Sequence, residues 1–308
     1  MRITPWMEQQ QFLYNLENIN TAMQQTQEQL STGKTLNLPQ DDPVAVSQDM
    51  ELASETSEMG AGLSTVSSGL SWMNATETAL QGMISQLQQI QSNVVAALNT
   101  TNQSQGGLAG YAATISQLVQ GVYQIADQKL GDRYLFGGQA WDVAPSSYTQ
   151  GSGAVPSGAD QDVSYQIVPG TVGSSGVSID VTVTAYSIFK STPSGAANDL
   201  QQTLDNIVSD LQNGDVTSLQ GDLNDLNANL ANVVNINADL GGRIQRMTSA
   251  QNLMQQYQTN LTNLKGGIEG ADMAQVMTQF STDQVIYEAA LQMGAQILLP
   301  SLVNYLPS

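Results

Sequence analysis

The sequence predicts a mainly α-helical protein with a small β insert. We expect a long antiparallel helical rod in which the N- and C-terminal halves pack together, terminal coiled-coil helices, and an inserted β domain. Two long stretches, 44–144 and 194–299, contain no proline, and an interior proline would remove a helix hydrogen bond. Apolar residues recur in both stretches at alternating steps of four and three, the pattern of helices packed as coiled coils. Residues 131–195 are instead rich in glycine and proline and carry β-branched residues at alternate positions.

These observations predict three parts, two of which draw on both halves of the chain. They are 1–43 with 269–308 as terminal helices, 44–130 with 196–268 as the helical rod, and 131–195 as the inserted β domain.

The first half of the rod is expected to be a helical hairpin with one long and one short arm. The polar run that begins at Thr100 and ends in Gly106-Gly107 indicates a reversal. The same spacing then resumes at Leu108 and continues to Lys129. The long arm has its seam at Met59, Leu63, Val66, Leu70, Met73, Glu77, Leu80, Ile84, Leu87, Gln91, Val94 and Leu98.

The second half of the rod is expected to be a short helix followed by a long one. The short helix covers about 196–211 and stops at Asn213-Gly214. Asp215 can cap the start of the long helix, because a carboxylate accepts hydrogen bonds from its first free amides. The long helix has its seam at Leu219, Leu223, Leu226, Leu230, Val233, Asn237, Leu240, Ile244, Met247, Gln251 and Met254.

The insert is expected to contain a β-hairpin. Residues 163–168 and 177–186 alternate by two and are rich in β-branched side chains, as strands with one wet face should be. Residues 169–176 supply a turn between them.

The two ends of the chain are predicted to be amphipathic helices that take part in assembly. Two such helices alone form a marginal structure, so we expect them to be disordered until neighbouring subunits supply further apolar contacts. The alternative is that they dock on the main body of the same chain. The expected interface residues are Phe12, Leu16, Ile19, Met23, Leu30, Met273, Val276, Phe280, Tyr287, Leu291, Ile297 and Leu298.

Composition excludes several kinds of function. The chain has neither cysteine nor histidine, so we expect no disulfide, no zinc or haem site and no Ser-His catalytic triad. A formal charge of −19 argues against nucleic acid as a partner, because neutralising phosphates needs clustered cations. No apolar run is long enough for membrane insertion or for a signal peptide.

Single motifs indicate no catalytic or ligand-binding site either. We expect no cofactor, no metal and no enzymatic activity. Gly33-Lys34-Thr35 resembles the end of a phosphate-binding loop, but Glu28 occupies the position of the first glycine. Asp41 and Asp42 lack the spacing of a calcium loop; Asp41-Asp42-Pro43 is more typical of a capped helix start. The other carboxylates show no pairing that would nominate a general acid and base.

Two arginines stand one turn apart on the otherwise acidic long helix. Arg243 and Arg246 could form surface ion pairs, which contribute little to stability. They could instead pair with carboxylates of a neighbouring subunit.

Four short motifs, in order along the chain, together resemble flagellin-type axial proteins of bacteria. The resemblance covers most of residues 1–140 and 196–308 and not the β insert. The opening Met-Arg-Ile and the Asp-Asp-Pro form favour the family's hook–filament junction proteins over its filament subunits. The first motif is Ser31, Thr32, Gly33, Lys34, Thr35, Leu36 and Asn37 with Asp41, Asp42 and Pro43; the others are 133–138, including Arg133, Phe136 and Gly137, 240–243, ending at Arg243, and 268–274 with 287–291 and 299–306.

This resemblance implies a secreted structural protein of the bacterial flagellum. It implies export through the flagellar type III channel with help from an export chaperone, and assembly as a ring of subunits. The neighbours in the axial structure would be hook-associated protein 1 below and flagellin above, with the ring serving as the template for flagellin assembly. The alternatives are a filament subunit and, from a different class, a type III secretion tip or translocator protein.

Overall fold

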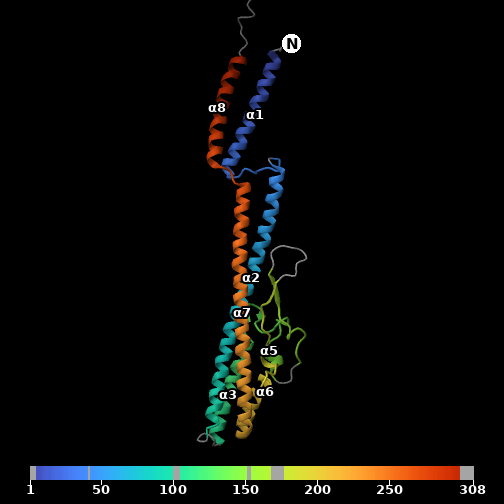
Figure 1. Ribbon diagram of the computed structural model, residues 1–308, viewed down its shortest axis with the longest axis vertical. Helices are drawn as coiled ribbons and strands as arrows, with labels where there is room; N and C mark the ends of the chain where they lie inside the picture. The colour runs from blue at the N-terminus through green and yellow to red at the C-terminus, as the bar shows by residue number, and fades with distance from the viewer. Residues whose placement is uncertain (1–4, 41, 100–104, 151–153, 168–176, 299–308) are drawn as a thin grey trace, which may run out of the picture. The chain divides into compact units, whose positions relative to one another are not determined.

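The computed structural model describes residues 5–40, 42–99, 105–150, 154–167 and 177–298 (Figure 1). Contacts divide the chain into two compact units, Met1–Ser57 with Tyr257–Ser308, called the terminal unit below, and Glu58–Gln256, called the central unit. The elements are α1 (Pro5–Thr32), α2 (Pro43–Ala97), α3 (Gln105–Ala126), β1 (Lys129–Leu130), β2 (Arg133–Tyr134), α4 (Ser146–Thr149), β3 (Ser164–Ile167), β4 (Val177–Asp180), α5 (Ala185–Phe189), α6 (Leu200–Asn213), α7 (Val216–Glu269) and α8 (Met273–Leu298).

The central unit contains the predicted antiparallel helices. Gly69 of α2 lies against Met247 of α7, and farther along α2 the Gln91 side chain donates a hydrogen bond to Asn227. Residue numbers therefore rise along α2 as they fall along α7. Between α2 and α3, Gly82 lies beside Ile125 in the same antiparallel sense as Gln86 beside Gly121. The prediction of an antiparallel rod built from both halves of the chain is confirmed.

Burial in the rod follows one file of each predicted seam. In both long helices this file is fully buried at every seventh residue, and other seam positions, such as Leu63 and Leu223, pack against it while partly exposed. In α2 the sequence prediction missed a second buried file, Thr76, Met83, Ile90 and Ala97. A seven-residue repeat keeps one file of side chains facing the same partners along the helix. The buried file is Met59, Val66, Met73, Leu80, Leu87 and Val94 in α2, and Leu219, Leu226, Val233, Leu240, Met247 and Met254 in α7.

Three helix ends differ from or refine the predictions. Helix α3 ends at Ala126, not at Lys129, because Lys129 enters a short antiparallel pair, β1 with β2. Helix α6 begins at Leu200, later than predicted, because the Asp199 side chain caps it through the Gln202 amide at 2.8 Å. The predicted stop at Asn213-Gly214 is confirmed, with φ of 73° at Gly214.

The predicted cap of the long helix α7 is also confirmed. The Asp215 carboxylate accepts hydrogen bonds from the amides of Thr217 and Ser218, both at 3.1 Å. The same contacts lower the pKa of Asp215 below its usual value, led by the hydrogen bond from the Ser218 hydroxyl.

The insert has its predicted hairpin, but the second strand is shorter than expected. Strand β4 pairs antiparallel with β3, with Tyr165 opposite Ile179. The prediction of a strand to Tyr186 was wrong: pairing ends at Asp180, and Thr184 caps the short helix α5 by accepting a hydrogen bond from the Ser187 amide. Alternation alone did not distinguish a strand from a buried connecting segment. Residues 131–195 lie in the central unit with α3 and α6, and their status as a separate domain stays a prediction. No helix among the described residues is long and apolar enough to cross a bilayer.

A buried carboxylate between α6 and α7 makes the stability of the fold depend on pH. Asp222 is 6% exposed, and burial, with the neighbouring Asp210, raises its pKa to about 7. Because the folded chain holds this proton more tightly than the unfolded chain, this contribution to stability is present below about pH 4 and is lost as pH rises toward 7.

We expect Asp222→Asn to remove that loss. At pH 8 the variant should unfold at a higher temperature than the parent chain, by about 4 °C for a gain of about 2 kcal/mol, and at pH 4 the two should be alike. Thermal unfolding followed by circular dichroism at both pH values measures this, with exposed Asp160→Asn as the control. Equal unfolding midpoints of the parent and Asp222→Asn at pH 8 would show that ionisation of the Asp222 carboxyl does not destabilise the folded chain.

Candidate functional site

The two ends of the chain form an antiparallel helix pair, α1 with α8 (Figure 1). The ring of Phe12 lies against Gly294, and the Thr26 hydroxyl donates a 3.4 Å hydrogen bond to Asp283. The facing positions follow steps of four and three in both helices, from Phe12 to Leu30 and from Val276 to Gly294. This is the spacing of a coiled-coil seam.

Most of the predicted interface residues lie in this seam. Val276 is buried, whereas Met273 and Leu291 are exposed. The side chains of Ile297 and Leu298 lie outside the described residues. The terminal helices thus bury part of their stripes against each other, and contact of these residues with neighbouring subunits stays a prediction. The half-buried members are Phe12, Leu16, Ile19, Met23, Leu30, Phe280 and Tyr287.

Apart from Leu291, the exposed apolar residues outside the seam were not predicted from the sequence. In the described part of the terminal unit, the buried apolar side chains are Leu261, Val276 and Ala290, whereas the central unit holds one continuous core. Large apolar side chains of α1 and α8 are exposed instead, by as much as 66% at Val285. Their apolar character off the seam was the available signal. We use the name outer face for these exposed residues of both helices taken together, although they are not all on one side of each helix: Trp6, Met7, Leu13, Tyr14, Met277, Val285, Ile286, Leu291 and Met293.

The helix pair is acidic. Its sequences contain carboxylates and neither lysine nor arginine. Asp283 is only 5% exposed and accepts hydrogen bonds from Thr26 and, at 3.0 Å, from Gln279. A buried carboxylate satisfied by neutral donors favours the one helix register that supplies them. The carboxylates of the pair are Glu8, Glu17, Glu28, Asp283 and Glu288.

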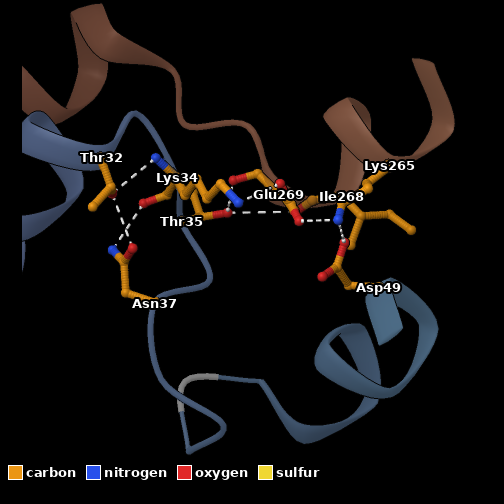
Figure 2. A network of polar contacts seen from close by, with 8 residues as sticks. All are labelled: Thr32, Lys34, Thr35, Asn37, Asp49, Lys265, Ile268 and Glu269. Atoms are coloured by element: carbon orange, nitrogen blue, oxygen red, sulfur yellow. Dashed lines mark hydrogen bonds and ion pairs between the residues drawn. The ribbon is translucent and has the colours of Figure 1, made fainter. Parts of the chain in front are cut away.

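Just beyond α1, the chain is joined to the segment that precedes α8, as Figure 2 shows. The Thr35 amide donates to the Glu269 carbonyl at 2.7 Å, and the Ala271 amide donates to the Gly33 carbonyl at 3.0 Å. Lys34 and Gly270 form the antiparallel bridge between these bonds. Gly33 has φ of 71°, a conformation that glycine adopts at little cost after a helix end. We call this paired segment, residues 33–35 with 269–271, the root clamp.

A charge cluster covers the root clamp. The Glu269 carboxylate lies 2.9 Å from Lys34 Nζ and 3.0 Å from Lys265 Nζ, and Lys265 Nζ is 3.7 Å from Asp49 of α2. These contacts, led by the hydrogen bond from Lys34, lower the pKa of Glu269 to about 2. Burial, followed by the contact with Glu269, raises the pKa of Asp49.

The first motif also stabilises its own turn. The Thr32 hydroxyl donates to Asn37 Oδ1 at 2.9 Å, and Asn37 Nδ2 donates to the Lys34 carbonyl at 3.1 Å (Figure 2). Thr35 Oγ1 adds a bond to the Glu269 carbonyl at 3.1 Å. Ser31 is exposed. Two motifs from opposite ends of the sequence thus form one structure, in which Glu269 belongs to the motif 268–274. Lys265 and Asp49 lie outside the predicted motifs.

Helix caps fix where the helices next to the clamp begin. The Asp42 carboxylate accepts from the amides of Val44 and Ala45 at 3.0 and 3.1 Å, and Pro43 occupies the first turn. The predicted capped start of α2 is confirmed for Asp42, while Asp41 lies outside the described residues. Asp272 caps α8 in the same way, through the amide of Ala274 at 3.0 Å.

The second motif lies where the chain leaves α3 for the insert. Phe136 is fully buried in the core, and its carbonyl accepts a 2.8 Å hydrogen bond from Ala185. Gly138 has φ of 59°, and a Cβ there would lie 2.6 Å from the Gln161 carbonyl. Gly137 is similarly crowded by the backbone, and the Arg133 guanidinium lies over the Trp141 ring, 4.9 Å from its centroid. The motif therefore has a packing role in the central unit.

Arg243 of the third motif is engaged within the chain. It pairs with Asp239 at 2.7 Å and donates to the carbonyls of Asp180 and Thr182, both at 3.4 Å. It thereby ties the insert to α7. The hypothesis that Arg243 and Arg246 pair with another subunit stays a prediction; Arg246 is exposed.

Comparisons with known proteins match the two helical ends of the chain and leave a segment between them unmatched. The N-terminal helical region of bacterial flagellin matches residues 3–140, and the C-terminal helical region of bacterial flagellin matches residues 223–306. The two regions together cover more than half of the sequence. The chain belongs to the flagellin family.

Individual relatives are similar to this chain at sequence identities of 17% to 23%. Flagellar hook-associated protein 3 of Salmonella typhimurium is 23% identical over 271 residues, which are 82% of this chain and 83% of that protein. The structure of a putative flagellar hook-associated protein from Vibrio parahaemolyticus covers 75% of this chain and is fully covered, at 17% identity and a TM-score of 0.62. FlgL from Bacillus cereus covers 71% of this chain and is also fully covered, at 20% identity and a TM-score of 0.54. These structures share the fold.

Proposed function

We propose that this protein is a structural, non-enzymatic subunit of the bacterial flagellum that joins the hook to the filament. The similarity to flagellar hook-associated protein 3 along most of both chains supports the junction role over that of a filament subunit. The structural observation that carries the proposal is the terminal unit. It presents an apolar outer face and contains few buried apolar side chains of its own.

The outer face needs neighbouring subunits to bury its apolar side chains. Patches of exposed apolar side chains on a monomer mark interaction surfaces. Burial of the outer face against other subunits would order α1 and α8 further, so that folding of the ends is coupled to assembly. Head-to-tail contacts between identical subunits suit a ring or an open tube.

The finer parts of the proposal concern partners and location. We propose that the subunits form a ring on hook-associated protein 1 and present a surface on which flagellin assembles. We propose export through the flagellar type III channel, with an export chaperone covering the C-terminal helix until then. Covering α8 would hide the side chains from Met277 to Met293 that otherwise favour premature association.

Deletion of the coding sequence tests the junction role. Electron microscopy should show hooks without filaments, and immunoblotting should find flagellin shed into the medium, because the ring that retains it is missing. Filaments of normal length on such cells would refute the proposal. Hooks without filaments and no secreted flagellin would instead favour the filament subunit.

A further inference from the structure

We propose that the charge cluster of Lys34, Asp49, Lys265 and Glu269 is an ionic latch that holds the two ends of the chain together in the free subunit. The latch would keep the root clamp closed, so that α1 and α8 leave the clamp side by side. This inference concerns the isolated chain and does not depend on its place in the flagellum.

The backbone pairing of the clamp is too small to persist by itself. It consists of one bridge between Lys34 and Gly270, flanked by the two hydrogen bonds that the amides of Thr35 and Ala271 donate. Even a complete two-stranded hairpin is marginal in water, and a pair of this length must be held by side chains. The apolar contribution is small, because Leu36 and Ile268 beside the clamp are only partly buried.

Glu269 is the centre of the cluster. Its side chain is 12% exposed, whereas those of Lys34 and Lys265 are 48% and 29% exposed. Ion pairs that are fully exposed contribute little, but a shielded carboxylate that two ammonium groups approach is screened less by solvent and salt. Lys34 follows α1, and Lys265 and Glu269 end α7 just before α8, so the carboxylate joins the segments next to both terminal helices.

Asp49 extends the cluster to α2. Its carboxylate lies 3.7 Å from Lys265 Nζ, so Lys265 bridges two carboxylates from different helices. Without the charge of Glu269, the two lysines would lose their common partner. The clamp would then depend on its backbone hydrogen bonds and on the bond from the Thr35 hydroxyl to the Glu269 carbonyl.

Hydrogen exchange at the clamp tests the latch in the full-length purified chain. In the parent chain, the amides of Thr35 and Ala271 should be protected. In Glu269→Gln, which keeps the shape of the side chain and removes its charge, they should exchange about ten-fold faster. Glu51→Gln makes the same charge change at an exposed position of α2 in the same unit, and it should leave both amides unchanged. Exchange measured by mass spectrometry on overlapping peptides reads both sites.

A second variant guards against a folding defect. Lys34→Gln alters an exposed side chain and should accelerate the same two amides in the same direction, while amides of the buried file in α2 keep the parent rate. Unprotected Thr35 and Ala271 amides in the parent chain would overturn the proposal. So would protection that survives both Glu269→Gln and Lys34→Gln, because the clamp would then close without the latch.

Discussion

Replacement of Phe136 by alanine is expected to lower the free energy of unfolding by about 4 kcal/mol, within the range for large-to-small changes of buried aromatic residues. The ring is fully buried at the point where the chain leaves α3 for the insert. The Phe136 carbonyl accepts a 2.8 Å hydrogen bond from the Ala185 amide. Two residues later, Gly138 is packed closely against neighbouring backbone atoms. The surrounding backbone therefore has little freedom to collapse into the space left by the ring.

Denaturant unfolding of the purified chain measures this loss. Leu130→Ala is the control, because Leu130 lies in the adjacent hairpin and is 41% exposed, and it should cost less than about 1 kcal/mol. A loss below about 1 kcal/mol for Phe136→Ala would show that the motif from Arg133 to Gly138 does not anchor the insert through its phenylalanine.

The second large effect is expected on assembly. Val285 and Ile286 belong to the outer face and are 66% and 45% exposed. Aspartate at both positions should leave the free chain folded, because these side chains have few contacts to lose. In an apolar subunit interface, two unpaired carboxylates cost several kcal/mol, and they would add to a helix pair that already lacks cations.

Much of the rod could be predicted from sequence, because its pattern and its packing have the same period. The buried file from Met59 to Val94 could be predicted from the sequence, because each position has the same environment as the one seven residues before it. The caps at Asp42 and Asp215 could also be predicted from the sequence, because a helix cap depends only on neighbouring residues.

Features that depend on distant contacts were not readable in the same way. The strand expected to reach Tyr186 ends early, because Thr184 and Ala185 are engaged by α5 and by Phe136. The clamp joins Lys34 to Glu269, which no spacing rule relates. Apart from Leu291, the outer face could not be predicted from the seam pattern, because apolar residues outside the seam gain contacts only when neighbouring subunits are present.

Complementation with the outer-face variant shows whether these residues hold the subunit in the flagellum. Cells that lack the gene would receive the parent chain, the chain with Val285→Asp and Ile286→Asp, or a control with Val155→Asp and Ser157→Asp, which puts the same charge on exposed insert positions. We expect the outer-face variant to be secreted but absent from isolated flagella, with hooks that carry no filament. The parent chain and the control should restore filaments. Filaments of normal number and length with the outer-face variant would contradict the claim that this face holds the subunit in the flagellum.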